Sequence, residues 1–171
     1  MDENVNSNIR WEKWTALGTV IMAICALLTS LWQGYTLKQH NMLSLRPYLE
    51  FEANSQKVPE NGVVFELLVN NNGVGPAEVT QMNIWLGDQK LTSTHQIWPQ
   101  LKVSAPLYCL GAGNVARFYK VDDQQMVIRA PKSCMLSENE YQHLMKNLRI
   151  ELTYQSLYGE IYHASWGVRA P

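Results

Sequence analysis

The clearest feature of the hydrophobic pattern is an uninterrupted apolar segment near the N-terminus. Residues 14–32 read WTALGTVIMAICALLTSLW and contain no charged side chain. A helix of this length spans about 28 Å, close to the ~30 Å hydrocarbon core of a bilayer. Aromatic side chains flank both ends, as expected of the belts at the two membrane interfaces; they are Trp11, Trp14, Trp32 and Tyr35. The pattern therefore predicts one transmembrane helix.

Three other interpretations of this segment fit less well. A cleaved signal peptide would need an A-x-A-like run of small residues after the apolar stretch, where this chain has Thr29, Ser30 and Leu31. A lipoprotein would need a small residue before Cys25, which follows Ile24. A buried core helix would not be expected to be apolar all round with tryptophan at both ends. An uncleaved anchor is the best interpretation.

Beyond Pro47 the period of the hydrophobic pattern falls from about 3.6 residues to 2, which indicates strands. Residues 63–69 are apolar on both faces and predict a central strand. Residues 148–154 alternate and predict a strand with one buried face. Further strands are expected at residues 47–53, 78–86, 115–120, 125–129 and 161–168, with an irregular stretch at 92–112.

One short helix interrupts this β pattern. Ser137 and Glu140 have capping-box spacing, and apolar residues follow at helical spacing, so a helix is expected at residues 137–146. Six to eight short strands separated by turns predict a mostly β domain, a sandwich or a barrel. The chain therefore divides into a tail (1–13), a transmembrane helix (14–32), a juxtamembrane linker (33–46) and a β-domain (47–171).

The charge of the chain limits the classes of partner that it can bind. It also gives a weak argument about the side of the membrane on which the β-domain lies. Charged residues make up 17% of the chain and the net charge is −1, so no basic footprint for nucleic acid is present. Arg10 and Lys13 precede the helix, and Lys38 and Arg46 follow it, so the positive-inside count is a tie. The lack of acidic residues between the helix and Glu50 marginally favours a cytoplasmic domain. The location expected is the bacterial inner (cytoplasmic) membrane.

The three cysteines give no disulfide framework and no zinc spacing. Cys25 falls in the apolar segment, which leaves Cys109 and Cys134 in the β-domain. Two buried free thiols are the favoured interpretation. A disulfide is the alternative if the domain faces an oxidising compartment.

No combination of residues predicts catalysis, a cofactor site or a metal site. Residues 111–116 match G-x-G-x-x-A, but a strand pattern follows them instead of the helix that a dinucleotide site needs. The four histidines have no ligand-like spacing. Asp122 and Asp123 are adjacent, so on a strand they would face opposite sides. We expect a protein that is not an enzyme.

Three short elements carry a resemblance to known proteins. They read HNMLSLRP at residues 40–47, NNGVGPA at 71–77 and YQSLYGE at 154–160. In these elements the chain resembles small uncharacterised bacterial single-pass membrane proteins, and the second is also similar to a strand exit in bacterial immunoglobulin-like adhesion-related domains. The resemblance implies an immunoglobulin-like β-sandwich and no activity. The helix at 137–146 and the stretch at 92–112 depart from a plain seven-stranded sandwich.

The sequence therefore leads to two functional hypotheses. The first is a non-enzymatic, membrane-anchored accessory or assembly protein whose β-domain binds a protein partner or another copy, as a subunit of an envelope or defence complex. The alternative is a membrane-tethered sensor, in which a small ligand held by the sandwich or barrel acts through the helix.

Overall fold

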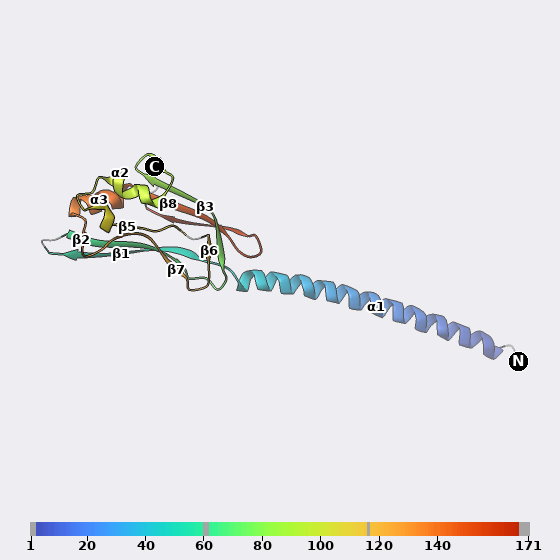
Figure 1. The fold of residues 1–171 in the computed structure, drawn as a ribbon. Coiled ribbons are helices and arrows are strands. Elements are labelled where there is room, and N and C mark those ends of the chain that lie inside the picture. Colours follow the sequence, from blue (N-terminus) through green and yellow to red (C-terminus); the bar gives the residue numbers. More distant parts are fainter. Residues whose placement is uncertain (1–2, 60–61, 116, 168–171) are drawn as a thin grey trace. The chain divides into compact units, whose positions relative to one another are not determined.

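The computed structural model describes residues 3–59, 62–115 and 117–167. The chain forms two compact units, Met1–Leu43 and Ser44–Pro171. The described part of the first is a single helix, and the second, here called the β-domain, consists of antiparallel sheets with short helices (Figure 1). The expectation of one N-terminal helix followed by a mostly β domain is confirmed.

The N-terminal helix is longer than the predicted membrane span. Helix α1 runs over Glu3–Ser44, so residues 33–44, expected as a linker, continue the helix. No proline interrupts the chain before Pro47, which explains this extension. The segment Trp14–Ser44 is long and apolar enough to cross a membrane, and its side chains are not buried by the rest of the chain.

The β-domain contains two antiparallel sheets. The order in the first sheet is β1-β2-β7-β5, and in the second it is β4-β3-β8-β9, with β6 paired to the start of β3. The bounds are β1 Leu49–Val58, β2 Gly62–Asn71, β3 Ala77–Leu86, β4 Gln89–Leu91, β5 Gly111–Ala112, β6 Phe118–Tyr119, β7 Gln124–Ala130, β8 Leu148–Gln155 and β9 Ile161–Trp166.

Strand positions follow from the apolar patterns. β2 lies between β1 and β7, as predicted for a central strand. One of its faces is buried along its length, and the other is half-buried apart from Leu68, which is buried. β8 buries every second residue, namely Leu148, Ile150, Leu152 and Tyr154. These side chains join one core with residues of the other sheet, including Phe65 and Ile128. The predicted strand at 115–120 is reduced to β6, and β4 and β5 were not predicted.

The capping box is present and begins α3, Glu138–Asn147. Ser137 N–H donates to Glu140 Oε2 at 2.7 Å, and Glu140 N–H donates back to Ser137 Oγ at 3.4 Å. The stretch expected to be irregular instead contains a 3₁₀ turn at Thr94–Gln96, helix α2 at Ile97–Leu101 and a second 3₁₀ turn at Leu107–Cys109. Its prolines, Pro99 and Pro106, obscured these short helices in the sequence.

Cys109 and Cys134 form a disulfide, so the interpretation of two free thiols is wrong. Their Cα atoms lie 6.1 Å apart, within the usual range for a disulfide. The bond joins the second 3₁₀ turn to the segment before α3. Sequence spacing alone does not reveal such a long-range approach. Cys25 in α1 is a free thiol.

Candidate functional site

The three elements that carry the family resemblance meet at one end of the β-domain. We call it the proximal end, because the chain enters the β-domain there; it comprises residues 45–48, 71–78, 117–123 and 154–161. Asn71 connects these segments through a buried side chain. Its Nδ2 donates to the carbonyls of Gly75 and Lys120 at 2.8 and 2.9 Å. Its Oδ1 accepts from the main-chain N–H groups of Tyr48 and Gly73 at 3.2 and 3.1 Å.

Two glycines of the same motif allow the incoming chain to lie directly against the loop. A Cβ atom at Gly75 would lie 1.8 Å from the Leu45 carbonyl oxygen, and one at Gly73 would lie 2.3 Å from the nitrogen of Tyr48. Both distances are far below van der Waals contact, so only glycine fits. Val74 N–H also donates to the Arg46 carbonyl at 3.2 Å. The incoming segment is therefore held firmly to the β-domain.

Aromatic side chains support this segment from the second sheet. The rings of Tyr154 and Tyr162 stack with centroids 5.6 Å apart, and the Arg46 guanidinium lies 4.9 Å above Tyr162. Tyr154 Oη accepts from Leu49 N–H at 3.2 Å. Burial raises the pKa of the Tyr154 hydroxyl, which keeps it neutral at physiological pH. The interaction is structural, with no group positioned for chemistry.

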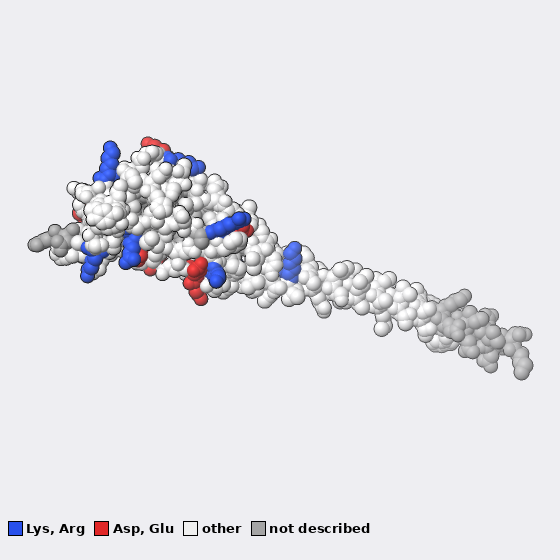
Figure 2. Space-filling model, in the orientation of Figure 1, with Lys and Arg blue, Asp and Glu red and all other residues white. Residues whose placement is uncertain are grey.

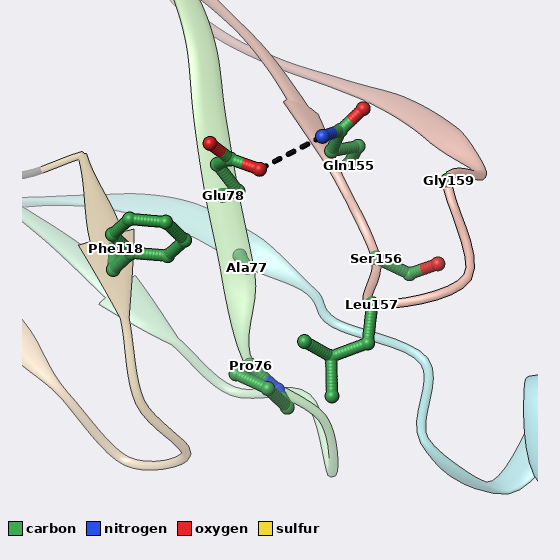
Figure 3. A pocket seen from close by; sticks show the side chains of 8 residues that line it. All are labelled: Pro76, Ala77, Glu78, Phe118, Gln155, Ser156, Leu157 and Gly159. Atoms are coloured by element: carbon green, nitrogen blue, oxygen red, sulfur yellow. Dashed lines mark hydrogen bonds between the residues drawn. The ribbon is translucent and has the colours of Figure 1, made fainter.

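A shallow pocket of about 200 Å³ opens at the same end. Figure 3 shows Phe118 on one side of β3 and Gln155, Ser156 and Leu157 on the other. Gln155 Nε2 donates to Glu78 at 2.8 Å and Arg117 Nε donates to it at 3.0 Å. The Gln155 bond and then the Arg117 bond lower the pKa of the Glu78 carboxyl. Glu78 is therefore a stably ionised, already paired group.

Exposed apolar side chains are concentrated at the proximal end. Ten large apolar side chains are exposed in the described part of the β-domain, and all but Leu107 and Tyr108 belong to the segments of this end. They are Leu45, Tyr48, Val74, Phe118, Val121, Leu157, Tyr158 and Ile161. Charged side chains of both signs are interspersed over the face of the domain seen in Figure 2. An apolar cluster of this kind is typical of an interaction surface.

The residues that were considered for cofactor binding or catalysis do not come together in one site. Gly111 begins β5 instead of a helix N-terminus, and Ala116 of the G-x-G-x-x-A match lies outside the described residues. Asp122 and Asp123 occupy the turn before β7, and neither lines a described pocket. Among the described residues, no group of three His, Cys, Asp or Glu side chains could hold a metal ion. The motifs of the proximal end are visible in the sequence, but no local pattern predicts that they meet.

Comparison with known proteins gives a family and no activity. The family described as a domain of unknown function, DUF8453, matches residues 11–169, and the chain belongs to it. No curated protein matches the chain.

Proposed function

We propose that this DUF8453 member is a non-enzymatic, membrane-anchored accessory or assembly protein whose β-domain binds a protein partner in an envelope or defence complex. The observation that carries the proposal is the proximal end. Its exposed apolar side chains occur on loops that Asn71, Gly73 and Gly75 hold in fixed positions. A preorganised apolar surface loses little conformational entropy on association, which favours binding.

We infer further that the domain has an immunoglobulin-like topology. The sheet orders β1-β2-β7-β5 and β4-β3-β8-β9 correspond to the ABED and C′CFG orders of that fold. Such sandwiches serve widely as binding modules, although a fold alone assigns no function. This supports a binding role over a catalytic one.

We also infer that the domain lies outside the cytoplasm of a bacterial cell. The Cys109–Cys134 bond supports this side, because structural disulfides persist in oxidising compartments. The inference reverses the marginal sequence-based preference for a cytoplasmic domain, which rested on a tied positive-inside count. A pair of topology reporters fused after Pro171, one active only inside and one only outside, tests it. A signal from the inside reporter would contradict it.

The experiment that tests partner binding compares two exposed positions. The full chain is extracted from its membrane in mild detergent and its size is measured on native gels. Leu157→Asp places a charge on the proximal end, and Tyr108→Asp places one on an exposed aromatic outside it. We expect a species larger than the monomer that Leu157→Asp abolishes and Tyr108→Asp preserves. A monomeric wild-type protein would contradict the proposal.

The alternative, a small-ligand sensor, has weaker support. The pocket beside Glu78 measures about 200 Å³, below the ~300–1,000 Å³ typical of ligand sites. A thermal-shift screen with nucleotides and metabolites tests it, and a ligand that raises the melting temperature would favour it.

A further inference from the structure

One edge of strand β9 forms no ladder with any other strand among the described residues. Ser156 N–H donates to the Glu160 carbonyl at 2.9 Å, which closes the β8–β9 hairpin. Antiparallel strands alternate hydrogen-bonded and non-bonded pairs. The main-chain groups of Tyr162, Ala164 and Trp166 therefore face β8. Those of the intervening residues, Ile161, His163 and Ser165, face away from it. We call this outward row the β9 free edge.

The other three sheet edges are short, covered or charged. β4 has three residues and β5 has two. The carbonyl of Gly111 in β5 already accepts from Trp98 Nε1 at 2.8 Å. β1 carries Glu50, Glu52 and Lys57, and charges of this kind discourage strand pairing. β9 reads IYHASW, with no Lys, Arg, Asp, Glu or Pro. Among the four sheet edges in the described residues, β9 is the one without such protection against an added strand.

A slot runs along this edge. β1 and β9 are neighbours at the side of the sandwich but form no ladder with each other. A cavity of about 280 Å³ lies between residues 48–51 and residues 163–166. Tyr48, an exposed residue of the proximal end, lines this cavity. The slot thus joins the apolar surface of the proximal end.

We propose that the slot binds an extended segment of a partner protein, which adds to β9 as a further strand. The proposal rests on the proposed function and specifies its partner site. An unpaired strand edge presents alternating N–H and C=O groups at peptide spacing, and a second peptide backbone matches that spacing. The occupant is therefore a polypeptide in extended conformation.

Charge beside the slot indicates the composition of that segment. Glu50 lines the slot, and Glu52 lies two residues further along β1. They accept hydrogen bonds from the side chains of Asn72 and Asn70 at 2.9 and 2.6 Å. Within the described residues neither carboxylate forms an ion pair. Complementary side chains are basic. The segment that fits best alternates apolar residues, which face the slot, with Lys or Arg.

A labelled peptide tests the proposal on the full chain in lipid nanodiscs. The probe is fluorescein-tagged Thr-Lys-Val-Lys-Val-Lys-Thr, and anisotropy measures its affinity. We expect saturable binding, weakened about tenfold by Ser165→Pro, which removes one outward N–H donor. Ser165→Ala keeps that donor and should bind like the wild type. Replacing the three lysines of the peptide by glutamate should also weaken binding.

A second form of the test does not depend on the folding of a variant. N-methylation of alternate peptide residues removes the donors along one side of the strand. One methylated set should bind the wild-type protein poorly and the complementary set should bind well. No saturable binding of the lysine peptide, or equal affinity for all proteins and peptides, would overturn the proposal.

Two outcomes separate this inference from the proposed function. If the native complex forms and Ser165→Pro leaves it intact, a partner binds elsewhere and only the β9 assignment fails. If Ser165→Cys in a Cys25→Ser background gives a covalent dimer of the full chain, a second copy occupies the edge. That dimer would overturn the assignment to a partner segment.

Discussion

The two sides of the β-sandwich close in different ways. On the β4–β5 side, the connection over residues 92–110, here called the cover, lies over the space between the sheets. Its side chains Ile97, Trp98 and Leu101 are buried. A disulfide and a hydrogen bond from Trp98 hold it in place. On the β1–β9 side no segment covers the sheet edges in the described part of the chain, and a cavity remains.

The difference shows which side has been stabilised and which is available for binding. A covered edge has its main-chain groups satisfied and contributes core packing. An uncovered, uncharged edge leaves main-chain groups for water or for a partner. The β4–β5 side, here called the closed side, therefore supports the fold. The β1–β9 side, here called the open side, is the better candidate for recognition.

The largest expected difference in the free energy of unfolding is between two variants, each of which removes a tryptophan from one side of the sandwich. Trp98→Ala should lower the free energy of unfolding by about 3–5 kcal/mol, because Trp98 is buried. Trp166→Ala on the open side should cost clearly less, because that ring is only partly buried against the core near Phe65. Chemical denaturation of both variants measures the difference. Equal losses would show that the two sides contribute equally to the core.

This contrast also marks the limit of sequence reasoning. The α1 segment, β2, β8 and the capping box at Ser137 were predicted because their signals are local periodicities. The cover at 92–110 was not, since its helices are too short to show a period and its anchors lie far away in sequence. The proximal end depends on Asn71 meeting Lys120 and Tyr48, which no local pattern reveals.

The next largest expected loss of stability follows removal of the disulfide on the closed side. It closes a loop of 25 residues, and the loss of chain entropy in the unfolded state stabilises the fold by about 3.5 kcal/mol. The double substitution Cys109→Ser and Cys134→Ser should lower the melting temperature accordingly. Cys25→Ser, which alters a free thiol outside the β-domain, is the control and should leave that transition unchanged. A double variant as stable as the wild type would mean that the bond is dispensable.

A smaller, pH-dependent effect is expected where the cover meets α3. Glu140 accepts from the main-chain N–H of Ser104 and of Ser137. Burial opposes ionisation, but these two donors outweigh it and lower the pKa of the Glu140 carboxyl. A lowered folded-state pKa gives stability that is present above the unfolded-state pKa and lost as pH falls through the folded-state pKa. Glu140→Gln should therefore be less stable than the wild type at pH 7.

The pH dependence of that difference is the decisive measurement. Denaturation from pH 7 down through the acid range should show the two proteins converging, because the wild-type carboxyl becomes neutral like the amide. Glu66→Gln, which removes a surface carboxylate of β2, serves as the control. A difference that stays constant with pH would show that ionisation of Glu140 contributes nothing to holding the cover.

The smallest effect tests the open side itself. Ser165→Pro removes an N–H that faces away from β8, so it should cost little stability, as proline does at the solvent side of an edge strand. Ala164→Pro, one residue earlier, removes an N–H that faces β8 and should cost clearly more, because a ladder hydrogen bond is lost. Thermal denaturation of the two variants compares neighbouring positions with the same substitution. Similar losses at both would mean that the outward N–H of Ser165 already has a partner, and the open side would then be closed to an added strand.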